Sequence, residues 1–142
     1  MAGRIVIDTS TLVGAALRPL SIPGKAFTLA LSEFELCVSI ESVNELEKVL
    51  HRDHFNVYVD LESRLTLLET VRVDAQFVLV PQSIQDETHG SCRDAKDDFI
   101  LALALSARAD AIVASDHDLL VLSPWRGITI LTPAQFVAQF SS

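Results

Sequence analysis

The 142-residue sequence has few cysteines and no long apolar runs. Its two cysteines, Cys37 and Cys92, lie far apart without a CxxC pair or a Cys/His cluster, which disfavours a disulfide framework or a zinc site. The apolar runs are shorter than the roughly 20 residues of a transmembrane helix. Asp8 also interrupts the apolar stretch at the start of the chain, whereas a signal peptide needs an uninterrupted apolar segment. We therefore expect a protein without a membrane span, in a reducing cytoplasm.

Nucleotide-binding fingerprints and internal repeats are also missing. No GxGxxG or Walker A sequence occurs, which argues against a dinucleotide-binding or P-loop protein. No low-complexity tract or change of composition marks a linker. Because 49% of the residues are hydrophobic, the chain can bury a sizeable core. A single domain over residues 1–142 is expected.

Basic residues are scarce, with 11 Lys and Arg against 19 Asp and Glu and a net charge of −8. Such a chain cannot bind nucleic acid through bulk electrostatics, because phosphate contacts need local Lys or Arg. If the substrate is a phosphodiester, a divalent metal is expected to neutralise the site. Isolated basic residues are usually just solvated. The candidates for contacts with RNA phosphates are Arg18, Lys25, Arg93 and Lys96, and the sequence singles out none of them for this role.

Short apolar runs alternate with segments of helical period along the chain. Strands are predicted at 4–7, 34–39, 77–80, 110–115 and 127–131. Helices are predicted after the first strand and at 24–32, 40–51, 60–73, 97–107 and 133–140, with a short turn at 117–120 and a polar loop at 81–92. This alternation predicts a three-layer α/β/α fold with a mainly parallel central sheet of about five strands.

Carboxylates gather where the strands are expected to end. Asp8 follows the first strand, and Asp116 follows the fourth. Glu45 lies in the helix after the second strand, while Asp97 and Asp98 open the helix before the fourth. Sites in parallel α/β sheets form at the carboxyl ends of the strands. Four segments are therefore expected to bring acidic side chains to one edge of the sheet.

Each acid also has an ordinary structural explanation. Asp8 can cap the helix that follows it, and Glu45 can lie on a solvated helix face. The remaining acids can be first-turn charges or turn residues: Asp94, Asp97, Asp98, Asp116 and Asp118. These explanations do not account for the set, because converging like charges cost stability unless they share a cation.

Oxygen-rich clusters of Asp and Glu are preferred by Mg²⁺ and Mn²⁺. Two such ions about 3.5–4 Å apart can bind the attacking water and the leaving oxygen in phosphodiester cleavage. The acidic pattern therefore indicates metal-assisted hydrolysis. On the helix, Asp98 points about 100° away from Asp97. Because the helix is apolar nearly all round, either residue can point inward. The helical phase nevertheless favours Asp97 as the one that faces the site.

Three stretches carry a resemblance to a known family. "IVIDTSTLVGAAL" resembles the first motif of PIN domains, and "SVNELEKVL" resembles their second motif. "RDAKDDFILALALSARADAIVASDHDLL" is similar to their third and fourth motifs. The resemblance covers nearly the whole chain, and it is closest to the VapC-like toxins of bacterial toxin–antitoxin systems.

The resemblance implies a Mg²⁺- or Mn²⁺-dependent endoribonuclease on a parallel α/β/α fold. The implied catalytic and metal-holding acids are Asp8, Glu45, Asp97 and Asp116, with Asp98 or Asp118 in support and Ser10 and Ser115 as supporting polar residues. An RNA substrate, a small inhibitory antitoxin protein and a homodimer are further implications. The sequence departs from the family at Ser10, where Asn is frequent, and at Ala95, where Pro is common.

Two other functions stay open on the residues alone. "DTST" after a strand faintly resembles phosphoaspartyl hydrolases or phosphate acceptors, although Ser10 occupies the place of their usual second aspartate. The chain can also be a non-catalytic α/β module that binds a partner, its carboxylates being structural. Neither alternative uses Glu45 and Asp97 together.

Overall fold

The computed structural model describes residues 3–141 and contains one five-stranded sheet. Its strands are β1 (Arg4–Ile7), β2 (Glu35–Val38), β3 (Gln76–Phe77), β4 (Ala111–Val113) and β5 (Thr129–Leu131). They are all parallel and follow the order β3-β2-β1-β4-β5. The predicted parallel sheet of about five strands is confirmed.

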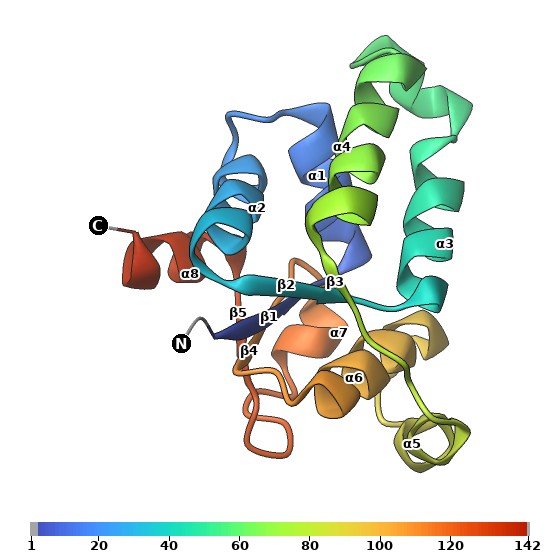
Figure 1. Ribbon diagram of the computed structural model, residues 1–142, viewed down its shortest axis with the longest axis vertical. Coiled ribbons are helices and arrows are strands. Elements are labelled where there is room, and N and C mark those ends of the chain that lie inside the picture. Colours follow the sequence, from blue (N-terminus) through green and yellow to red (C-terminus); the bar gives the residue numbers. More distant parts are fainter. Residues whose placement is uncertain (1–2, 142) are drawn as a thin grey trace.

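Helices cover both faces of this sheet (Figure 1). One layer holds α1 (Thr9–Leu17), α2 (Ile22–Glu33), α3 (Ile40–Leu50), α4 (Leu61–Asp74) and α8 (Pro133–Phe140). The opposite layer holds α5 (Gln82–Thr88), α6 (Ala95–Ala107) and α7 (His117–Leu120). A short 3-10 helix, η1 (Asp53–Val57), joins α3 to α4. The predicted three-layer α/β/α fold is therefore confirmed.

Alternate strand residues serve the two layers. Ile5 and Ile7 of β1 belong to the apolar cluster under α1–α4 and α8, whereas Val6 belongs to the cluster under α6 and α7. The same alternation divides Val113 from Ile112 in β4. Because successive side chains of a strand point to opposite faces, a sheet covered on both sides needs these near-continuous apolar strands.

Helix starts follow from local capping. Ser39 and Ser42 form a reciprocal capping box at α3, and Thr132 and Gln135 form one at α8. The helix predicted at 24–32 begins two residues earlier, because Pro23 and Gly24 lie in the first turn of α2. A Cβ atom on Gly24 would lie 2.0 Å from the Pro19 carbonyl oxygen, so only glycine allows this close approach.

Two predicted elements differ from the structure. The polar loop expected at 81–92 contains α5, whose Thr88 hydroxyl donates to the Ile84 carbonyl and which packs on α6. Only Gln76–Phe77 pair as β3, although a strand was expected at 77–80. After Val78 donates to the Val38 carbonyl, the chain leaves this sheet edge, so the apolar run has no further partner strand.

Both cysteines are free, buried thiols in the apolar cluster beneath α6. Burial raises the pKa of Cys37 and of Cys92, so both are protonated and poorly nucleophilic near neutral pH. Within residues 3–141, no helix has the length and apolar character needed to span a bilayer.

Candidate metal centre

The acidic residues meet at the switch point of the sheet. β1 and β4 are neighbours, but β1 continues into α1 on one face, while β4 continues toward α7 on the other. The chain therefore diverges at the carboxyl ends of these two strands. Such a divergence leaves a crevice in parallel α/β sheets, and sites form there.

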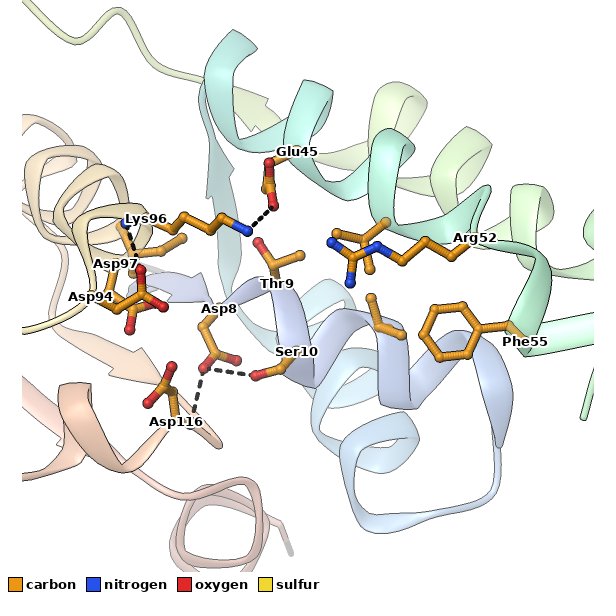
Figure 2. Close-up of a pocket in the computed structure, with 13 residues that line it drawn as sticks. Asp8, Thr9, Ser10, Glu45, Arg52, Phe55, Asp94, Lys96, Asp97 and Asp116 are labelled. Carbon is orange, nitrogen blue, oxygen red and sulfur yellow. Dashed lines mark hydrogen bonds and ion pairs between the residues drawn. The ribbon is translucent and has the colours of Figure 1, made fainter.

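A cleft of about 300 Å³ opens at this point (Figure 2). The four acids predicted as catalytic all line it, although they come from four different segments: Asp8, Glu45, Asp97 and Asp116. Asp94 lines it as well. The fold thus brings together carboxylates that are up to 108 positions apart in sequence.

Asp8 ties the two central strands together at the floor of the cleft. Its side chain is only 1% exposed, and its Oδ1 accepts a hydrogen bond from the Thr11 N–H at 2.9 Å, which caps α1. Its Oδ2 accepts from the backbone N–H groups of Ser115 at 3.0 Å and Asp116 at 3.3 Å. The capping role considered for Asp8 is real, and the same carboxylate also fixes the start of the segment that carries Asp116.

The two predicted supporting serines lie around this carboxylate. The Ser10 hydroxyl donates to Asp8 Oδ2 at 3.3 Å. Ser115 uses its hydroxyl in a 2.7 Å hydrogen bond with that of Thr11, which joins α1 to the end of β4. Both serines therefore act on the position of Asp8 and of its neighbours.

Asp94, Asp97 and Asp116 form the tightest group of acids. One carboxylate oxygen from each lies within 4.8 Å of the others. Asp94 caps α6 by accepting from the Lys96 N–H at 3.0 Å, and Asp116 caps α7 by accepting from the Asp118 N–H at 2.9 Å. In each case Oδ1 accepts the capping hydrogen bond. Asp94 and Asp116 therefore each cap a helix and also line the cleft.

Asp97 is the most perturbed acid of the group. Burial raises its pKa to about 8, and the adjacent Asp116 and the charges of Asp94 and Asp8 act in the same direction. The usual value is near 4. A carboxyl group in this environment binds a proton or a cation, because either one removes the uncompensated negative charge.

Glu45 stands on the opposite wall, on α3, with a side chain that is 30% exposed. Its Oε1 lies 4.0 Å from Lys96 Nζ, and it does not belong to the group of three acids. Figure 2 shows this pair above the aspartates.

Asp98 and Asp118 do not line the cleft. The Asp98 carboxylate accepts backbone hydrogen bonds from Gly90 and Cys92, both at 2.8 Å, and so holds the loop before α6. Asp118 contributes backbone groups: its N–H donates to Asp116, and its carbonyl accepts from the Cys92 thiol at 3.3 Å.

Several residues that line the cleft were not assigned to the site from the sequence, and Asp94, Arg52 and Phe55 are the ones whose chemistry matters most. Asp94 could have been found, because it precedes Asp97 by three positions and caps the same helix. Arg52 and Phe55, which lie at the other end of the cleft, carry no recognisable signal. Of the four basic candidates, Lys96 lines the cleft, whereas Arg18, Lys25 and Arg93 do not.

Sequence comparison places residues 4–118 in a match to the PIN domain. A full-length similarity links the chain to the uncharacterized protein MJ1680 of Methanocaldococcus jannaschii, at 24% identity over 96% of this chain and 91% of that protein.

Two solved structures have a similar fold. One is Mycobacterium tuberculosis VapC20, described as a sarcin-ricin loop cleaving toxin, with a TM-score of 0.61, 15% identity, and coverage of 88% of this chain and 98% of that chain. The other is VapBC2 of Rickettsia felis bound to a DNA fragment from its promoter, with a TM-score of 0.64, 12% identity, and coverage of 91% and 98%. At these identities the likeness shows a shared fold.

Proposed function

Because the chain belongs to the PIN domain family, we propose that it is a metal-dependent endoribonuclease and the toxin of a toxin–antitoxin pair. The observation that carries this proposal is the convergence of five carboxylates on one cleft, with the pKa of Asp97 raised to about 8. A cation would relieve this repulsion. The description of VapC20 as a toxin that cleaves the sarcin-ricin loop supports RNA as the substrate class.

The residues fit Mg²⁺ or Mn²⁺ by their donor chemistry. The closest group, Asp94, Asp97 and Asp116, offers only carboxylate oxygens, which hard divalent cations prefer. Asp8 and Glu45 complete the proposed acidic set from the floor and the opposite wall. When bound, the ion supplies an activated water and stabilises charge on the phosphoryl oxygens.

The protein's own groups hold this arrangement in place. Asp8 fixes the backbone at Ser115 and Asp116, so that the Asp116 carboxylate keeps its direction toward Asp97. With its pKa raised to about 8, Asp97 holds a proton at neutral pH, and a cation held by these acids would displace it. No histidine, serine or lysine side chain is needed as a nucleophile in this proposal.

The environment of Asp8 argues against the phosphoaspartyl alternative. A nucleophilic aspartate needs an accessible oxygen, but Asp8 is 1% exposed and both of its oxygens accept backbone hydrogen bonds. The partner-binding alternative gives no reason for three carboxylate oxygens within 4.8 Å of one another. Trapping a phosphoryl group on Asp8 would restore the first alternative.

The proposal includes partners and a compartment. An RNA-cleaving toxin needs an inhibitor, and the resemblance to VapC-like toxins together with the shared fold of VapBC2 supports such a pair. We therefore propose a small antitoxin protein, a homodimer and a cytoplasmic location. Co-expression with the small open reading frame expected upstream, followed by purification and molar-mass measurement, tests the complex and the dimer together.

The decisive experiment is a cleavage assay on mixed RNAs. Purified protein should cut RNA with Mg²⁺ or Mn²⁺ and not in EDTA, and Asp8→Asn should remove the activity. Equal cleavage in EDTA would reject metal dependence. Full activity of both Asp8→Asn and Asp116→Asn would reject the assigned site.

A further inference from the structure

The segment after α3 brings a cation and an aromatic ring to the end of the cleft away from the acids. Arg52 occupies the position just before η1 without a side-chain capping bond, and Phe55 lies within η1. Both line the same cleft as Asp97 and Asp116 (Figure 2). The cleft therefore has an acidic end between α6 and α7, and a mixed basic and apolar end beside η1.

A buried arginine fixes this segment. Arg64 of α4 is only 1% exposed, and its guanidinium donates to the Val59 carbonyl at 3.2 Å and to Asn56 Oδ1 at 2.9 Å. Its Cζ lies 5.9 Å from the centre of the Phe55 ring. Burying a guanidinium without a carboxylate partner is costly unless hydrogen bonds compensate. Asn56 belongs to η1 and Val59 follows it closely, so Arg64 holds this stretch, and with it Phe55, in one position, while its own Nε has no hydrogen-bond partner.

Arg52 is available for an anionic ligand. No carboxylate pairs with it among residues 3–141, whereas Lys96, the other cation lining the cleft, lies beside Glu45. Figure 2 shows the Arg52 side chain reaching along the cleft toward Thr9. A planar guanidinium matches a phosphate in two hydrogen bonds, which a lysine cannot do.

An apolar wall lies beside Arg52. Val13 of α1, Val49 of α3 and the ring of Phe55 line this end of the cleft. Phe55 also packs on the main apolar cluster, so little flexibility is lost when a ligand covers it. Proteins that bind single-stranded nucleic acid combine such an apolar or aromatic surface for a base with a cation for the backbone.

We propose that this end of the cleft is a nucleotide subsite. It takes the nucleotide next to the cleaved phosphodiester of a single-stranded RNA, with its phosphate on Arg52 and its base or ribose against Phe55, Val13 and Val49. This subsite gives an acidic protein a local cationic contact beside its acidic centre. The inference rests on the proposed nuclease function, and names where its substrate is held.

Arg52→Gln tests the subsite in two measurements. In the cleavage assay with Mg²⁺, KM for a single-stranded oligoribonucleotide should rise about 10-fold, with kcat nearly unchanged, as expected for one charge-assisted contact. In the non-cleaving Asp116→Asn background, fluorescence anisotropy of the labelled oligoribonucleotide should report a similar loss of affinity. The slope of log affinity against log salt should fall by about 0.7, the value for one phosphate on a single strand.

Arg18→Gln is the matched control, because Arg18 is an exposed arginine beyond the far end of α1 and does not line the cleft. It should leave KM, affinity and salt slope unchanged. Phe55→Leu, which keeps apolar packing, should raise KM without changing the salt slope, and its thermal unfolding should confirm that it is folded.

The outcomes separate this inference from the proposed function. If the wild type cleaves RNA and Arg52→Gln behaves like Arg18→Gln in KM and salt slope, the subsite is wrong and the nuclease stands. If the wild type neither cleaves nor binds the oligoribonucleotide, both fail. Reduced binding by Arg52→Gln in the Asp116→Asn background supports the subsite even where cleavage of that sequence is slow.

Discussion

Asp97 and Asp98 are consecutive residues of α6 and are buried almost equally, at 9% and 8% exposure. Their surroundings are opposite. The two oxygens of Asp98 accept backbone hydrogen bonds at 2.8 Å, one from Gly90 and one from Cys92. Asp97 instead faces Asp94 and Asp116, accepts a long hydrogen bond of 3.8 Å from the Cys92 thiol, and has a pKa raised to about 8.

The contrast shows that burial alone does not distinguish a structural acid from a candidate ligand. A buried carboxylate with donors stabilises the loop that it holds, because its charge is compensated. A buried carboxylate among other carboxylates destabilises the fold until a proton or cation joins it. Of these two neighbours on one helix, Asp98 therefore stabilises the fold, and Asp97 belongs to the candidate site.

The largest expected effect is on activity. Asp97→Asn removes one of the three clustered carboxylates and should lower RNA cleavage by more than about 100-fold, since loss of even an outer partner of a metal ligand costs about 10–100-fold. Asp98→Asn should retain most of its activity at a temperature where it is folded. Initial rates with saturating Mg²⁺ would measure the ratio. Equal losses in the two variants would break the distinction between the neighbours.

The next effect is on stability. Asp98→Ala leaves the Gly90 and Cys92 N–H groups without their acceptor and should lower the free energy of unfolding by about 2–4 kcal/mol. Glu69→Ala, an exposed site on α4, is the control and should change it by less than about 0.5 kcal/mol. Urea unfolding of both variants gives the comparison. A change for Asp98→Ala as small as that of the control would contradict a structural role.

In the absence of metal, Asp97→Asn should stabilise the fold, whereas Asp98→Ala destabilises it. At neutral pH the folded wild type must keep a proton on Asp97 that the unfolded chain releases, and the variant avoids this cost, so it should raise the unfolding temperature in EDTA by about 2–4 °C, which corresponds to about 1 kcal/mol. Added Mn²⁺ should then stabilise the wild type and have little effect on the variant. A lower unfolding temperature of the variant in EDTA would show that the Asp97 carboxylate is already compensated.

The advantage of that variant should also depend on pH. In the folded state Asp97 holds its proton up to about pH 8, whereas the unfolded chain releases it near pH 4. The folded state therefore binds more protons between these values, and metal-free wild type loses stability relative to Asp97→Asn as pH rises from 5 to 8. Thermal unfolding in EDTA at both pH values measures this change. An advantage that shrinks with rising pH would contradict the raised pKa.

The smallest effect is expected at the wall opposite the two aspartates. The Lys96–Glu45 pair spans 4.0 Å, and the lysine side chain is 61% exposed. Lys96→Gln should change the free energy of unfolding by less than about 0.5 kcal/mol, as is usual for exposed pairs. Urea unfolding measures it, and a loss above about 1 kcal/mol would show a stronger structural contact.

Much of the fold could be predicted because it is encoded locally. The apolar runs ending at Ile7 and Val113 and the capping residues Ser39 and Thr132 each define an element within a few positions. The short strand β3 and helix α5 could not be predicted in this way. The extent of β3 depends on its pairing with β2, which is distant in sequence, and α5 depends on its packing against α6.

The same distinction holds in the cleft. The acids after β1 and β4 could be predicted from strand ends, and helical phase favoured Asp97 over Asp98. Arg52 could not, because its position in the cleft depends on how Arg64, twelve positions later, holds the η1 segment. In the sequence of an amphipathic helix, a buried arginine looks the same as an exposed one, so its burial cannot be predicted.

The most direct test is the rate of RNA cleavage as a function of Mn²⁺ concentration, for the wild type and for Asp97→Asn. The wild-type rate should be zero in EDTA and rise to saturation as Mn²⁺ is added, while the variant should stay near zero over the same range. Wild-type cleavage that is the same with and without Mn²⁺ would contradict the claim that these carboxylates form a metal centre.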